Sequence, residues 1–238
     1  MPKSTMVKTP EEIKLIIEGG LILGEILDNL ACRVVAPGVS TLEVDKEAER
    51  LILKAGGRPA FKGYRPDKDV TPFPSTICAS INEEVVHAPA TPGRVLKEGD
   101  IFSIDVGMEY PYKGVKCGYF TDTAITVPVG RVSAKSQHII AVTHAALLKG
   151  IEAARAGRNI AHIGKAIEAH AKQFGIGIVR ALVGHGVGYQ VHEPPQIPNY
   201  FVRSLEQIKL VPGMVLALEP MFTLGTGEVV FLQDGWTV

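Results

Sequence analysis

Ile-Phe-Ser-Ile-Asp-Val-Gly, residues 101–107, is an apolar stretch with the composition of a β-strand, and it is interrupted by the carboxylate of Asp105. A lone buried carboxylate is costly, and it becomes protonated unless a cation or hydrogen-bond donors meet it. The stretch contains no Lys or Arg, so the cation must come from elsewhere. Three polar side chains interrupt later apolar segments in the same way, namely Asp122, His185 and Glu219. The recurrence indicates a metal site.

The predicted ligand set consists mostly of oxygen atoms, with one imidazole. Such a set suits Mn, Fe, Co or Zn better than Ca or a structural zinc site built from thiolates. Residues 119–127 also have strand composition, and an antiparallel hairpin with 101–107 would bring Asp105 and Asp122 onto neighbouring strands. Several carboxylates available for bridging favour two ions about 3.5–4 Å apart, as in hydrolases that activate water between metals. The loop between these strands, which includes Lys116, is interpreted as a solvated hairpin tip.

The chain repeats its own pattern. Each half is expected to begin with two helices, each of which ends at a glycine. These glycines are Gly38 and Gly56 in the first half, and Gly157 and Gly175, 119 positions later, in the second. Residues 96–101 resemble 210–215 at an offset of 114, which matches Asp105 with Glu219, and 86–89 resemble 191–194. We therefore expect an α+β fold with pseudo-two-fold symmetry, in which residues 1–238 form a single domain with halves at about 9–128 and 129–238.

Composition excludes several classes of protein. The 238 residues carry 25 basic and 25 acidic side chains, so the formal charge gives no signal for nucleic acid or another polyelectrolyte. The N-terminus has no apolar signal-peptide region and no later apolar run could span a membrane, so we expect a cytoplasmic protein. The cysteines at positions 32, 78 and 117 are odd in number and widely spaced, which argues against a disulfide framework.

These residues closely resemble the type I methionine aminopeptidases, a family with the pseudo-two-fold pita-bread fold of creatinase and the aminopeptidases. The resemblance covers essentially the whole chain, in motifs at 73–87, 99–105, 118–123, 184–188, 191–196, 218–221 and 234–238. Type II enzymes carry a large insertion between the second catalytic histidine and the Glu-Pro motif, whereas only 26 residues separate His192 from Glu219. The resemblance implies a single catalytic domain that removes the initiator methionine from nascent polypeptides. It also implies a monomer, and association with the ribosome is expected from this task.

By the same resemblance, Asp105, Asp122, His185 and Glu219 are the metal ligands, for up to two divalent ions (Co, Mn, Fe or Zn). A metal-activated hydroxide would attack the scissile carbonyl, and Glu219 would also carry a proton toward the leaving amine.

The remaining site residues implied by the resemblance bind substrate. His87 and His192 would be catalytic through hydrogen bonds to the substrate amide and the tetrahedral intermediate. Cys78, Phe73, Trp236 and Tyr64 would form the walls of the pocket for the methionine side chain, since sulfur and aromatic surfaces suit a thioether.

The pattern departs from the family at the end of the sequence. The family has a fifth ligand, a Glu on a strand beyond the Gly-Trp-Thr-Val motif, whereas the printed sequence stops two residues after Trp236. Either the sequence is a truncated copy of a longer enzyme, which the intact motif up to Val238 favours, or it is a natural short form that holds one metal ion with four ligands. We expect this chain to bind a first metal ion weakly, hardly to bind a second, and to show little turnover. The alternative functions are a non-catalytic pita-bread binding protein, which the missing Glu favours, and a proline-specific peptidase of the same fold.

Overall fold

The computed structural model describes residues 6–114 and 118–238, so Lys116 and Cys117 lie outside the described residues. The chain divides into two compact units. Unit 1 consists of Met1–Pro10, Ala134–Val187 and His192–Val229, and unit 2 consists of Glu11–Ser133, Gly188–Val191 and Val230–Val238. Among the described residues, no helix combines the length and the apolar character that crossing a membrane requires.

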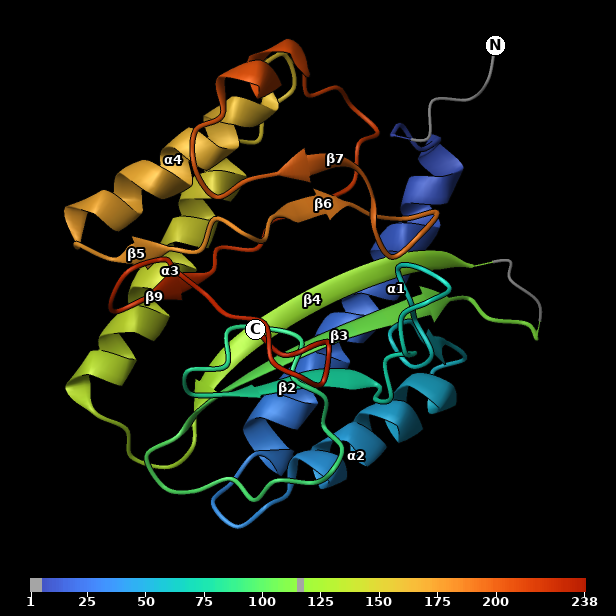
Figure 1. The fold of residues 1–238 in the computed structure, drawn as a ribbon. Coiled ribbons are helices and arrows are strands. Elements are labelled where there is room, and N and C mark those ends of the chain that lie inside the picture. Colours follow the sequence, from blue (N-terminus) through green and yellow to red (C-terminus); the bar gives the residue numbers. More distant parts are fainter. Residues whose placement is uncertain (1–5, 115–117) are drawn as a thin grey trace. The chain divides into compact units, whose positions relative to one another are not determined.

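Unit 2 is a sheet with two helices on one face (Figure 1). The helices are α1 (Pro10–Asn29), which continues into the π-helical turn η1 (Leu30–Val34), and α2 (Thr41–Lys54). The strands are β1 (Arg58–Pro59), β2 (Ile77–Ile81), β3 (Ile101–Tyr110) and β4 (Tyr119–Pro128). Among the described residues, β1, β2 and β4 each pair with β3, and all three pairings are antiparallel.

The alternation of side chains along β3 decides where the core of unit 2 lies. Phe102, Ile104, Val106 and Met108 are fully buried in a cluster with apolar residues of α1 and α2. Since successive strand residues point to opposite faces, Asp105 belongs to the face opposite this core. The apolar sequence around Asp105 predicted a buried carboxylate, whereas Asp105 is half-buried.

A buried aspartate joins α2 to the start of β2. Asp45 is 5% exposed, and its Oδ1 accepts hydrogen bonds from the backbone N–H groups of Thr76 at 2.7 Å and Ile77 at 3.0 Å. Burial raises the pKa of Asp45 more than these two hydrogen bonds lower it. The contact fixes where β2 begins, and therefore the register in which β2 meets β3.

Unit 1 contains two helices and two small sheets (Figure 1). The helices are α3 (Ala134–Ala153) and α4 (Ile160–Gln173), with the 3-10 helix η2 at Arg203–Gln207. One sheet pairs β5 (Gly177–Ile178) with β9 (Phe222–Thr223). The other has the order β7 (Glu193–Ile197), β6 (Gly184–Gly186) and β8 (Leu216–Ala217). Its core includes Ile160, Ile163, Ile167 and Ile197.

The two units repeat the same backbone pairings. Arg58 pairs with Glu109 in unit 2 as Gly177 pairs with Thr223 in unit 1, at the offsets of 119 and 114 found in the sequence. The isolated bridges Ser40–Val95 and Asn159–Lys209 have the same two offsets. The glycines at 38, 56, 157 and 175 all have positive φ. These matches are what an internal duplication produces. The bounds of the halves, at about 9–128 and 129–238, stay a prediction, because the two compact units exchange short segments across them.

The repeat also places Glu219. Ser80 pairs with Ser103 in unit 2 as His185 pairs with Ala217 in unit 1, so β8 and β9 together correspond to the single long strand β3. Glu219 lies between β8 and β9, at the position equivalent to Asp105. Two of the metal ligands expected from the sequence, Asp105 and Glu219, thus occupy equivalent backbone positions in the two units.

Candidate metal and substrate site

The hairpin expected from residues 101–127 is confirmed. Asp105 lies opposite Ala124 and Asp122 lies opposite Gly107 in the antiparallel pair β3–β4, so the two aspartates are diagonal neighbours on one face. Both are half-buried. Gly107 is needed between them, because a Cβ at that position would lie 2.5 Å from the Cε1 atom of Phe61. Unit 2 therefore presents two carboxylates at adjacent places on the sheet.

His185 and Glu219 meet within unit 1. The His185 side chain is 10% exposed, and its Nε2 lies 2.9 Å from Oε1 of Glu219. The other ring nitrogen, Nδ1, is 2.9 Å from the carbonyl oxygen of Gly186. A carbonyl can only accept a hydrogen bond, so Nδ1 carries a proton, and in a neutral ring Nε2 would present its lone pair.

This arrangement fits a divalent metal ion. Among the described residues, Oε1 of Glu219 is one of the buried side-chain oxygens for which no hydrogen-bond partner is found, although Nε2 of His185 lies at ion-pair distance. When His185 is neutral and its proton is on Nδ1, the lone pair of Nε2 faces Oε1 of Glu219. Two electron-pair donors this close repel each other unless a cation binds both. Imidazole and carboxylate are ligands that Mn, Fe, Co and Zn accept together.

A residue that the sequence analysis missed holds Glu219 in place. Asn199 is 1% exposed, and its Nδ2 donates a 2.7 Å hydrogen bond to the backbone carbonyl of Glu219. The residue after Glu219 is Pro220, which has no N–H and so cannot anchor this segment by a backbone hydrogen bond. The sequence signal that could have identified Asn199 is that this polar residue directly follows the apolar residues Ile197 and Pro198.

His192, the second histidine predicted to bind substrate, lies beside the first candidate ligand. Its ring centroid is 4.4 Å from that of His185, with the rings inclined at 66°. His192 is exposed, whereas His185 is buried. An exposed imidazole next to a buried metal-ligand candidate is suitably placed to hydrogen-bond a substrate.

His87 is held in an uncommon backbone conformation in unit 2. Its φ is +60°, and apart from Asn82 it is the non-glycine residue with positive φ among those described. Its neighbours are fixed on both sides, since the carbonyl of Val86 accepts from Val238 N–H at 3.2 Å and that of Ala88 accepts from Ala79 N–H at 2.7 Å. Non-glycine residues in this region cluster at functional sites, where the surrounding structure imposes the conformation.

The residues predicted to line the methionine pocket also lie in unit 2. The rings of Phe73 and Trp236 meet edge to face, with centroids 5.1 Å apart. The N–H of Phe73 donates a 2.8 Å hydrogen bond to the carbonyl of Tyr64, and burial raises the pKa of the Tyr64 hydroxyl. Cys78 is buried and pairs with Asp105 across β2 and β3, which places both side chains on the same face.

The turn that carries Trp236 is pinned by one carboxylate. Oδ1 of Asp234 accepts from the N–H groups of Trp236 at 3.0 Å and Thr237 at 2.9 Å, and Oδ2 accepts from the Thr237 hydroxyl. Burial raises the pKa of Asp234, but the hydrogen bonds from Thr237 and Trp236 outweigh it and hold the pKa below its ordinary value. The charged carboxylate therefore fixes the turn at neutral pH.

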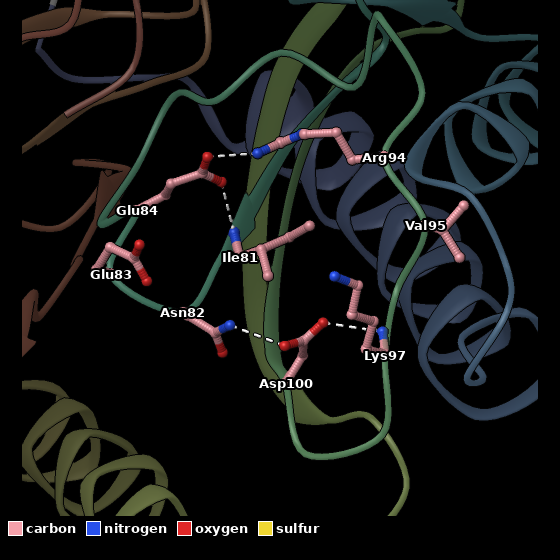
Figure 2. A pocket seen from close by; sticks show the side chains of 8 residues that line it. All are labelled: Ile81, Asn82, Glu83, Glu84, Arg94, Val95, Lys97 and Asp100. Atoms are coloured by element: carbon pink, nitrogen blue, oxygen red, sulfur yellow. Dashed lines mark hydrogen bonds and ion pairs between the residues drawn. The ribbon is translucent and has the colours of Figure 1, made fainter.

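A separate hollow in unit 2 has a structural role (Figure 2). In it, Glu84 accepts from both Arg94 and the N–H of Ile81, while Asp100 accepts from Asn82 at 2.8 Å and from the N–H of Lys97 at 2.9 Å. The hollow is lined by Ile81, Asn82, Glu83, Glu84, Arg94, Val95, Lys97 and Asp100. These bonds hold the turn after β2, on the way to His87.

Comparison with known proteins identifies the family. The model of metallopeptidase family M24 matches residues 14–238, and the chain belongs to this family. The α+β pita-bread fold expected from the sequence is thereby confirmed. The chain is 43% identical over 233 residues to a methionine aminopeptidase of Borreliella burgdorferi, covering 98% of this chain and 87% of that protein.

Two further relatives have similar names. Methionine aminopeptidase 1 of Bacillus subtilis is 42% identical over 232 residues, which is 97% of this chain and 87% of that protein. The crystal structure of a methionine aminopeptidase from Thermotoga maritima superposes with a TM-score of 0.87 at 35% identity, covering 97% of this chain and 87% of that one. The expected class of enzyme, a metal-dependent peptidase, follows from the family.

Proposed function

We propose that this chain is a methionine aminopeptidase that removes the N-terminal initiator methionine from newly made proteins. The family and the relatives at 42–43% identity support the reaction class and the substrate. The observation that carries the proposal is the pairing of His185 Nε2 with Glu219 Oε1 at 2.9 Å, which brings together an imidazole and a carboxylate that one divalent ion can bind.

Under this proposal, Asp105, Asp122, His185 and Glu219 hold one or two divalent metal ions, with Mn, Fe, Co and Zn as the candidates. A divalent ion bound by such ligands lowers the pKa of water and polarises the substrate carbonyl. Asp105 and Asp122 supply negative charge from one sheet face, and Nδ1 of His185 stays protonated because the Gly186 carbonyl accepts from it.

The remaining residues bind and orient the peptide. His87 and His192 donate hydrogen bonds to the substrate amide and to the oxygen that becomes negatively charged during attack. Glu219 also transfers a proton to the leaving amine. Phe73, Trp236, Tyr64 and Cys78 surround the methionine side chain, whose thioether packs well against aromatic rings and sulfur.

Location and assembly belong to the same proposal. The substrate is made in the cytoplasm, so we place the enzyme there, acting on nascent chains near the ribosome as a monomer. A non-catalytic binding protein is less well supported, because His185, Glu219, Asp105 and Asp122 are all present in a family of metallopeptidases.

Substrate preference tests the proposed function. With Mn or Co added, we expect cleavage of Met-Gly-Met-Met with kcat/KM at least about tenfold above that for Leu-Gly-Met-Met, since side-chain discrimination by an apolar pocket is typically 10–200-fold. N-acetylated Met-Gly-Met-Met and an Ala-Pro dipeptide serve as controls that an aminopeptidase with this specificity leaves intact. Preferential cleavage of the Pro substrate, or binding of methionyl peptides without hydrolysis at any metal concentration, would contradict the proposal.

A further inference from the structure

A buried ion pair lies next to the histidines of unit 1. The Nζ of Lys8, in the segment before α1, contacts Oε1 of Glu193, the first residue of β7. The two side chains are 0% and 4% exposed, and 185 positions separate them in the sequence. The pair thus ties the N-terminal segment to the start of β7, next to His192.

Stability alone does not explain such a pair. Taking two charges out of water costs several kcal/mol per ion, and apolar residues of similar volume often stabilise a protein as much or more. Exposed pairs such as Lys149 with Glu152, whose side chains are 53% and 62% exposed, do not bear this cost. A buried pair is better explained by a requirement for one defined geometry.

The start of β7 has little capacity for backbone hydrogen bonds. Glu193 is followed by Pro194 and Pro195, neither of which has an N–H to donate to the neighbouring strand. Pairing with β6 is irregular here, because the register shifts between Gly184 and Gly186. A side-chain contact at Glu193 therefore replaces backbone hydrogen bonds that this segment cannot make.

The backbone of Lys8 is itself anchored. Its N–H donates a 2.8 Å hydrogen bond to the carbonyl of Gly213. Gly213 has φ +95°, and a Cβ there would lie 2.8 Å from the Lys8 carbonyl oxygen, so the two segments are closely packed. The ammonium of Lys8 is consequently held from a fixed backbone.

Glu193 transmits this position to both histidines. It directly follows His192, and it lies opposite Gly186, the residue whose carbonyl faces Nδ1 of His185. The His185 and His192 rings are in contact, with centroids 4.4 Å apart. A displacement of Glu193 would alter the orientation of the exposed ring relative to the buried one.

We propose that Lys8 and Glu193 are positioning residues, which hold His192 against His185 in the geometry needed to bind substrate and metal. The inference deepens the proposed function and rests on it for the roles of the two histidines. Lys8 and Glu193 act through the start of β7 and do not themselves contact the substrate.

The test compares single and double variants of the full chain. Lys8→Met removes the cation that contacts the buried carboxylate of Glu193, so we expect kcat for Met-Gly-Met-Met to fall about tenfold or more, as for residues that orient metal ligands. Lys8→Met/Glu193→Met removes both charges, and we expect it to regain the thermal stability of the native protein without regaining kcat. Lys8→Arg keeps a cation at the position and should recover part of the activity, while Lys149→Met is the exposed control and should change neither quantity.

A second measurement does not depend on activity. In metal-free protein, the ¹⁵N imidazole resonances of His185 and His192 should shift in the double variant and stay unchanged in Lys149→Met. A double variant that regains both stability and kcat, or whose histidine resonances coincide with those of the native protein, would overturn the positioning role. If the native protein cleaves no methionyl peptide, the proposed function fails, whereas the resonances still decide whether the pair positions the histidines.

Discussion

Replacing His185 with Ala lowers kcat/KM for Met-Gly-Met-Met by at least about a thousandfold, because an activated water and the charge stabilisation of a metal site depend on the ligand set. The variant also leaves the half-buried carboxylate of Glu219 without the imidazole 2.9 Å away. We therefore expect the affinity for Mn or Co, measured by calorimetric titration, to fall together with the activity. His185 is the only candidate ligand that is an imidazole, so no other ligand replaces its nitrogen.

His162→Ala is the matched control. His162 is an exposed histidine on α4 in the same unit, with a 2.7 Å contact from its Nδ1 to the side chain of Asn159. Its loss should leave both metal affinity and activity within about twofold of native values, as for most surface substitutions. A His185→Ala variant that binds metal as tightly as the native chain and keeps its activity would rule out the ligand role.

The second large effect concerns His87. His87→Ala should lower kcat by about 10²–10³, the range found when a donor to a developing oxyanion is removed. Metal affinity should stay unchanged, since this histidine is proposed to bind substrate and not metal. Steady-state kinetics with Met-Gly-Met-Met and a parallel metal titration separate the two quantities.

The positive φ of His87 requires a second variant. Alanine at φ +60° is strained, so part of any loss could come from a displaced backbone. Asn tolerates this region, so His87→Asn keeps the backbone while shortening the donor. We expect His87→Asn to keep native stability and still lose more than about tenfold in kcat. Native kcat in His87→Asn would show that the backbone conformation matters and the imidazole does not.

Local patterns in the sequence predicted much of the fold. Short stretches of sequence predict the helix pairs, the hairpin of β3 and β4, and the glycines that end the helices. Those glycines have positive φ in the structure. The sequence offsets of 119 and 114 also relate the backbone pairings of the two units, since Arg58 pairs with Glu109 and Gly177 pairs with Thr223. The pattern of apolar residues does not predict that the first helix changes its winding, since α1 ends at Asn29 and the π-helical turn η1 continues to Val34.

Contacts between distant segments account for what the sequence could not predict. No periodicity links Lys8 to Glu193 across 185 positions, and the role of Asn199 depends on a carbonyl 20 positions away. The sequence identified Asp105 by its apolar neighbours, but those neighbours belong to the core on the opposite face of β3. The apolar neighbours thus correctly marked Asp105 as an unusual carboxylate. They wrongly suggested that its side chain lies on the core face of the sheet.

The most direct test of a metal-dependent aminopeptidase is to remove metal from the purified chain with a chelator and titrate Mn or Co back. We expect hydrolysis of Met-Gly-Met-Met to be absent without metal and to rise with each addition to a plateau, in step with the heat of binding. Full hydrolysis in the presence of chelator, or binding heat that never yields any hydrolysis, would contradict this account.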